Sequence, residues 1–178
     1  RVHPALVPNS HPLASVDGAF NAVFIESQAA GPLMFYGQGA GGAPTASAVV
    51  GDLVSAGRHR VLGGTGPRRS SYAEIPILPS GEVRTHFQLR LRVVDEPGVL
   101  AQVSQSLAEQ SVSIETVRQI LDKQARDEAS RNGTEKPTAA LVVTTHEASE
   151  AALAATVEAL ENLDVVTEIV SILRVEGA

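Results

Sequence analysis

Hydrophobic and polar residues follow two different periods in the second half of the chain, and each period predicts one kind of element. From Phe87 to Val93 every second residue is apolar and the residues between are Gln or Arg, which predicts a strand with one buried face. Residues 112–120, 138–145 and 165–175 are further apolar runs of strand length. We expect four strands in this half.

Helical spacing separates these strands at two places. Leu100, Val103, Leu107 and Ala108 form one apolar stripe, preceded by Pro97 and a capping acid in residues 95–96. A second stripe, Leu153, Val157 and Leu160, follows Ser149 as its cap. The order is βαββαβ, which predicts a ferredoxin-like sandwich with both helices on one face of an antiparallel sheet.

The first half predicts a strand, a glycine-rich loop and a helix in succession. Residues 33–36 are apolar or aromatic, residues 37–42 hold four glycines, and Pro44 suits a first helical turn. Apolar residues 46, 49, 50, 53 and 54 share one helical face, so the helix is expected to pack on a sheet and to end at Gly57 in a left-handed cap. Before it, we expect a strand over 2–7, a short helix over 16–21 and a strand over 22–25.

Two segments carry weaker patterns. Residues 61–82 read as a linker that packs through Tyr72, Ile75, Ile77 and Leu78. Residues 122–137 are dominated by alternating charges around an Asn-Gly turn, which predicts an exposed hairpin extension.

Composition excludes several kinds of site. The 178 residues carry a net charge of −6, which argues against a nucleic-acid surface, and the absence of cysteine rules out disulfides and thiolate metal ligands. The five histidines lack metal-site spacing, so no metal is expected. No signal segment or membrane-length apolar run is apparent, and we expect a cytoplasmic protein. Because the sequence opens on Arg1, with a strand directly after it, we infer a fragment.

Gly37, Gly39 and Gly42 satisfy the G-x-G-x-x-G dinucleotide pattern formally. The acidic residue that should follow about 20 positions later to hold a ribose is absent. A helix N-terminus beyond the glycines favours an anion, whereas a tight turn that only lets the helix approach a sheet explains the glycines equally well.

Three ordered motifs in the first sixty residues resemble homoserine dehydrogenase. They are RVHPALVP at 1–8 with HPLA at 11–14, GAFNAV at 18–23, and GQGAG at 37–41 followed by PTASAV at 44–49 and Asp52-Leu53. The resemblance implies the tail of a substrate and dimerisation domain over residues 1–30 and the last strand-loop-helix of a Rossmann-type nucleotide-binding domain over 31–60. It also implies that Gly41 contacts the nicotinamide nucleotide, NADP or NAD, with Gly39 and Ala40 shaping the loop.

The second half resembles the ACT domain, a regulatory module that binds amino acids. LRLRVVDEPGVL at 89–100 and SVSI at 111–114 carry this resemblance, with Ser113 where many amino-acid-binding members have Asn. It implies an ACT domain over 83–178 after the linker at 61–82. The implied effector site has six residues: Asp95, Gly98, Val99, Leu100, Ser113 and Ile114.

Together the resemblances imply an α/β and α+β chain, the C-terminal portion of an NAD(P)-dependent homoserine dehydrogenase. Such an enzyme interconverts L-homoserine and L-aspartate 4-semialdehyde on the route to threonine, isoleucine and methionine, with threonine as the expected effector and a homodimer or homotetramer as the expected assembly. Its catalytic residues would lie upstream of Arg1, so the chain alone is expected to be inactive. The alternative is a stand-alone amino-acid-binding or dimerisation module without catalysis.

Overall fold

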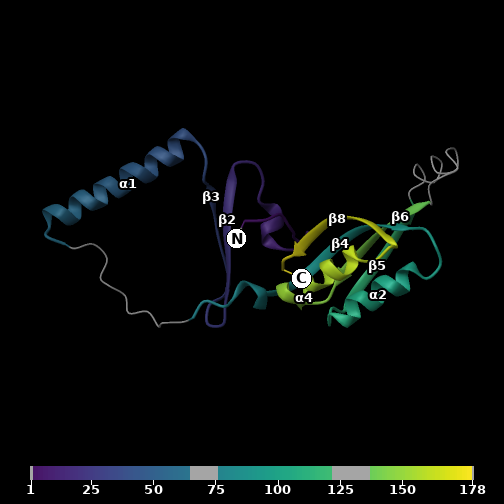
Figure 1. The fold of residues 1–178 in the computed structure, drawn as a ribbon. Coiled ribbons are helices and arrows are strands. Elements are labelled where there is room, and N and C mark those ends of the chain that lie inside the picture. The colour runs from purple at the N-terminus through teal and green to yellow at the C-terminus, as the bar shows by residue number, and fades with distance from the viewer. Residues whose placement is uncertain (1, 65–75, 122–136, 178) are drawn as a thin grey trace. The chain divides into compact units, whose positions relative to one another are not determined.

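Two compact units make up the chain in the computed structural model, which describes residues 2–64, 76–121 and 137–177 (Figure 1). The first unit combines residues 1–8 with residues 77–178, and the second consists of residues 9–76. The charged extension expected over 122–137 therefore lies outside the described residues, except for its last position.

The first unit is built on a sheet in the order β1-β8-β4-β6-β5. Its neighbours are antiparallel except for β1 and β8, which run parallel. A short strand, β7, also pairs with β4. The strands are β1 (Ala5–Leu6), β4 (Arg84–Val94), β5 (Ile114–Leu121), β6 (Thr138–Thr145), β7 (Ala148–Ser149) and β8 (Val166–Val175).

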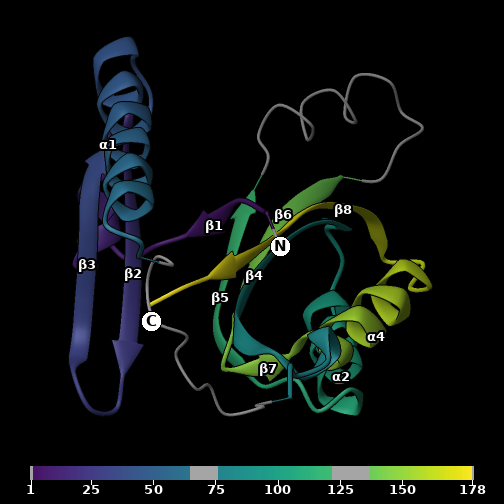
Figure 2. The same cartoon turned by 90° about the vertical axis from the view of Figure 1, so that its left-hand side faces the viewer.

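Two helices, α2 (Val99–Glu109) and α4 (Glu150–Glu161), lie on the same face of this sheet (Figure 2). A 3-10 turn, η2 (Ser80–Glu82), precedes β4. The predicted βαββαβ order is confirmed from β4 to β8, with β7 added between β6 and α4. The pairing of β1 with β8 was not predicted, since residues 2–7 had been expected to form a strand without a known partner and only Ala5–Leu6 do so.

The core of the first unit lies between the sheet and the two helices. The predicted alternation along β4 is confirmed, because Phe87, Leu89, Leu91 and Val93 are all fully buried. Further core residues come from α2, α4 and β6: Val103, Leu107, Leu153, Leu160, Leu141 and Val143. The predicted α2 stripe was wrong at its ends: Leu100 is 46% exposed and Ala108 is exposed, while Val99 is buried.

Polar groups inside this unit have specific partners. The Thr145 hydroxyl accepts a hydrogen bond from the Phe87 N–H at 3.1 Å, and Ser149 caps α4 by accepting from the Ala152 N–H, as predicted. Arg174 on β8 forms an ion pair with Glu150 in the first turn of α4. The hydrogen bond to Glu150 raises the pKa of Arg174 above its ordinary value, although partial burial opposes the shift.

The second unit contains a hairpin and a long helix. Its elements are η1 (Pro12–Ser15), β2 (Phe20–Ser27), β3 (Gly31–Gln38) and α1 (Gly42–Val61). β2 and β3 pair antiparallel, from Phe20 opposite Gln38 to Ser27 opposite Gly31. Phe20 stacks on Tyr36 with ring centroids 4.8 Å apart, and His11 meets the edge of Phe24 at 4.5 Å.

Several predictions for this unit were wrong. Residues 16–21 are not helical: the helical turn comes earlier, at Pro12–Ser15, and Phe20 already belongs to β2. The helix α1 continues through Gly57 to Val61, because the left-handed residue that allows the chain to leave it is Gly63, with φ +70°. The Gly64 N–H then bonds the His59 carbonyl at 2.8 Å, which closes the helix end.

The expected packing of α1 on a sheet is also absent from the described residues. Val49, Val50, Leu53 and Val54 are 48–72% exposed, and no described residue of the second unit is buried. In the linker, Ile77 and Leu78 are 96% and 67% exposed and do not anchor it, while Tyr72 and Ile75 lie outside the described residues. Among the described helices none has the length and apolarity to cross a membrane.

Candidate functional site

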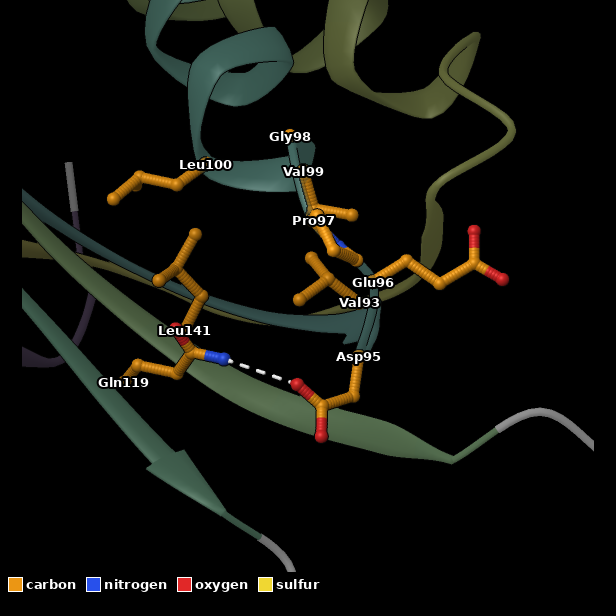
Figure 3. A pocket seen from close by; sticks show the side chains of 9 residues that line it. All are labelled: Val93, Asp95, Glu96, Pro97, Gly98, Val99, Leu100, Gln119 and Leu141. Carbon is orange, nitrogen blue, oxygen red and sulfur yellow. Dashed lines mark hydrogen bonds between the residues drawn. The ribbon is translucent and has the colours of Figure 1, made fainter.

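A cavity of about 360 Å³ lies where β4 ends and α2 begins (Figure 3). Val93 lies near the end of β4, Asp95 directly follows that strand, and residues 96–100 form the turn and the start of α2. Gln119 on β5 and Leu141 on β6 complete the lining. Four of the six residues that the ACT resemblance implied, namely Asp95, Gly98, Val99 and Leu100, are thus brought together around one space.

The turn at this cavity depends on the backbone of Gly98. Gly98 is the residue before α2 and has φ +91°, a left-handed conformation that residues with a Cβ avoid. The N-cap residue of α2 is Gly98 and not an acid of residues 95–96, so the predicted capping acid was wrong. The Gly98 carbonyl accepts from the Gln102 N–H at 3.1 Å, whereas the Asp95 N–H bonds the Pro137 carbonyl at 2.7 Å.

The cavity offers an apolar floor and a polar rim. Val93, Val99 and Leu141 supply buried apolar surface. The Asp95 carboxylate accepts a long hydrogen bond of 3.5 Å from the Gln119 amide across the opening (Figure 3). The first N–H groups of α2 lack helical partners and carry the positive end of its dipole. A small ligand with both an anionic and a cationic group fits these features chemically.

Ser113 and Ile114 do not line this cavity, although the ACT resemblance grouped them with Asp95. They lie at the start of β5, where the Ser113 carbonyl accepts from the His146 N–H at 2.8 Å and Ile114 packs against the core. Gln119, five residues further along the same strand, faces the cavity instead and was not predicted. The position of the Gln119 side chain could not be predicted from nearby residues, because it depends on the β5–β6 register, which places Gln119 opposite Leu141.

The glycine loop forms a second candidate site in the other unit. Gly41 is the residue before α1, with φ +129°, and a Cβ there would meet the Pro44 ring at 3.3 Å. A Cβ on Gly39 would lie 1.9 Å from the side-chain amide nitrogen of Asn21 on β2, so that exposed side chain would have to move. Ala40 is exposed. Of these residues, Gly41 alone has a backbone conformation that residues with a Cβ avoid.

This loop fits only part of a nicotinamide nucleotide. The first turn of α1 has no acidic residue, and a hollow of about 650 Å³ beside it is lined by Gly41, Gly42, Thr45, Ala46, Val49 and Val50. Backbone N–H groups can approach a phosphate or amide of a ligand there. Within the described ranges no group of three or more His, Asp or Glu side chains is arranged to hold a metal ion.

Comparison with known proteins gives one consistent result. The family model described as homoserine dehydrogenase matches residues 1–54. Curated homoserine dehydrogenases from Mycobacterium tuberculosis (strain ATCC 25618 / H37Rv) and Corynebacterium glutamicum are 55% and 49% identical, over 99% of this chain. The matches cover 38% and 37% of those relatives, so the chain spans well under half of their length.

Solved structures agree with the sequence comparison. The crystal structure of a homoserine dehydrogenase from Thiobacillus denitrificans matches with a TM-score of 0.78 and 38% identity, over 99% of this chain and 38% of that one. A homoserine dehydrogenase from S. aureus, at 23% identity and a TM-score of 0.54, covers 98% of this chain and 37% of its own and shows likeness of fold.

These matches make the chain a homologue of an oxidoreductase, with a mixed α/β fold that the oxidoreductase structures share. That oxidoreductase is homoserine dehydrogenase, and the homology extends over the whole of this chain.

Proposed function

We propose that the chain is the C-terminal part of an NAD(P)-dependent homoserine dehydrogenase, consisting of the end of its catalytic region and an ACT regulatory domain. The complete enzyme would interconvert L-homoserine and L-aspartate 4-semialdehyde in the cytoplasm. The 55% identity over 99% of the chain supports this proposal. A further support is that the family model ends at residue 54, before the βαββαβ unit.

In the catalytic region, we assign Gly41 to contact with NADP or NAD. Gly41 has a φ of +129° and no side chain, so a ligand can approach the backbone directly before a 20-residue helix. The first N–H groups and the dipole of that helix favour an anionic group there. Gly39 and Ala40 shape the loop. When bound, the nicotinamide supplies hydride transfer, and this loop's task is to orient the nucleotide.

The regulatory part rests on one observation: four residues implied by the ACT resemblance surround a single cavity together with Gln119. About 360 Å³ is at the lower end of the range for small-molecule sites and suits an amino acid. The ligand carboxylate would meet the first N–H groups of α2, and its ammonium would meet Asp95. L-threonine, an end product of the proposed pathway, is the proposed effector.

A second copy of the chain would complete this site in the proposed homodimer or homotetramer. Ser113 and Ile114 lie away from the cavity of their own chain, at the start of β5. In the described sheet β5 pairs on one side only, with β6. Residues of this edge strand are therefore positioned to reach another copy.

Titration of the 178-residue chain with L-threonine, followed by calorimetry, tests the effector proposal. We expect saturable binding of L-threonine and much weaker binding of D-threonine, because the mirror image cannot present its carboxylate, ammonium and side chain to the same three surfaces. In the complete enzyme, L-threonine should inhibit homoserine oxidation. If neither measurement responds to L-threonine, L-isoleucine or L-methionine, the sensing role is wrong and the C-terminal unit is better explained as an assembly element.

Inhibition tests the choice between a part of an enzyme and a stand-alone binding module. If the chain acts only as a binding module, the 178-residue chain should bind an amino acid, but that amino acid should leave the activity of the complete dehydrogenase unchanged. Binding together with inhibition would support the regulatory domain of an enzyme.

A further inference from the structure

Strand β8 has its two ends at two different places in the fold. Its first residue, Val166, pairs with Val93, which lines the cavity at the start of α2. Its last residue, Val175, pairs with Leu6 in β1. A strand of ten residues spans roughly 30 Å. One continuous element therefore connects the surroundings of the cavity with the strand at the amino-terminal end of the chain.

The strand β1 belongs to the part of the sequence that the homoserine dehydrogenase family model matches. It nevertheless pairs within the C-terminal sheet, through Ala5 opposite Arg174 and Leu6 opposite Val175. The Glu176 N–H also donates to the Leu6 carbonyl at 2.9 Å. Three residues after the end of β1, at Asn9, the chain enters the other unit. The pairing therefore holds the amino-terminal end of the chain in the C-terminal sheet, within the first unit.

The β1 end of β8 is firmly held by the rest of its unit. Backbone pairing joins Arg174 to Phe87, which is fully buried. The Arg174 side chain pairs with Glu150 of α4, and the two side chains are 22% and 13% exposed. From Phe87 the buried residues of β4 continue to Val93. Because close-packed cores deform little, these contacts give a shift at β1 a packed route along β4 and β8.

The cavity end of β8 is less regular. The β4–β8 register shifts between Arg90 and Leu91 and again between Arg92 and Val93. Beyond these irregularities the Val94 N–H bonds the Val165 carbonyl at 2.9 Å, and the Thr167 hydroxyl bonds the Arg92 carbonyl at 3.0 Å. β-bulges locally interrupt the ladder and alter strand direction. The segment beside the cavity is therefore where a displacement of β8 changes local geometry.

We propose that the β1–β8 pair is a conformational link between the region matched by the family model and the cavity. Release of β1 alters the conformation of residues 94–100, and a ligand in the cavity alters the pairing of β1 by the same coupling free energy. The regulatory meaning of this link rests on the proposed effector function, whereas the link itself is measurable without any ligand.

Hydrogen exchange followed by mass spectrometry on the 178-residue chain tests the link. Glu176→Pro removes the N–H that donates to Leu6, and Glu176→Ala is the matched control, since it removes the same carboxylate but keeps the N–H. In Glu176→Pro, residues 2–8 should exchange about five-fold faster or more, and residues 94–100 should also exchange faster than in Glu176→Ala. Leu6→Pro, compared with Leu6→Ala, disturbs the same pair from the β1 side.

Faster exchange at residues 94–100 in either proline variant supports the link. Three results overturn it: residues 2–8 of the parent exchanging as an unstructured peptide, residues 2–8 unchanged in both proline variants, or residues 94–100 keeping the parent rate after β1 is released. Calorimetry with L-threonine on the parent is scored separately. Absence of binding there counts against the effector function alone, because the exchange comparison uses no ligand.

Discussion

Two substitutions of Gly98 distinguish the effect of backbone strain on stability from the effect of an added carboxylate on ligand binding. Gly98 has φ +91°, and an added Cβ would find no heavy atom within 4 Å. Gly98→Ala therefore introduces left-handed strain without a clash, which costs about 1–2 kcal/mol of unfolding free energy. In a domain of this size each kcal/mol lowers Tm by roughly 4–8 °C. L-threonine binding should weaken only modestly, because the methyl group meets open space.

Gly98→Asp should act on binding instead. Asp adopts the left-handed region more readily than Ala, so its loss of stability should be no larger. Its carboxylate, however, would stand beside Asp95 and at the N–H groups that the ligand carboxylate needs. We therefore expect loss of L-threonine binding and of threonine inhibition, with the uninhibited kcat of the complete enzyme close to the parent value.

Thermal unfolding and calorimetry on the two Gly98 variants check this reasoning, with Gly63→Ala as the control. Gly63 has φ +70° and an equally open Cβ position at the end of α1, so it introduces similar strain away from the cavity. Gly63→Ala should leave L-threonine affinity unchanged. Parent-like affinity in Gly98→Asp would refute the location of the ligand, and parent-like stability in Gly98→Ala would refute the left-handed conformation.

Three further outcomes are expected. Assayed alone, the 178-residue chain should reduce neither NAD nor NADP with L-homoserine; turnover comparable with a full-length control would contradict the proposed division of the enzyme. In the complete enzyme, Gly41→Val should raise the KM for the nucleotide sharply while Gly63→Val does not; a lowered Tm with the parent KM would make Gly41 a turn residue only. Thr145→Val should cost about 1–3 kcal/mol because the Phe87 N–H loses its partner, whereas Thr145→Ser should largely retain stability, as denaturant unfolding would measure.

The sequence patterns predicted structure correctly where the apolar face that they indicate is buried. The alternation from Phe87 to Val93 is confirmed because α2 and α4 cover that face of β4, and the Ser149 cap is confirmed because its partner, the Ala152 N–H, lies three residues away. The stripe on α1 has equally clear spacing, yet its face is exposed in the described residues. Periodicity reports that a face is apolar, and burial depends on which surface covers it.

Features set by register or by distant pairing were missed. Nothing near Leu6 in the sequence indicates Arg174 and Val175 as neighbours, because a parallel edge pairing leaves no local signature. Gln119 faces the cavity through the β5–β6 register. The end of α1 was misplaced because Gly57 and Gly63 both suit a helix terminus, and only Gly63 adopts the left-handed conformation.

The absence of buried residues among the described parts of the second unit has a thermodynamic consequence. A single hairpin is marginally stable in water, and a helix gains most of its stability from tertiary packing. With Val49, Val50, Leu53 and Val54 open to solvent, burial within the described chain contributes little to the stability of α1. Any surface that binds the folded hairpin and α1 but not their unfolded forms would therefore raise their folded population by mass action.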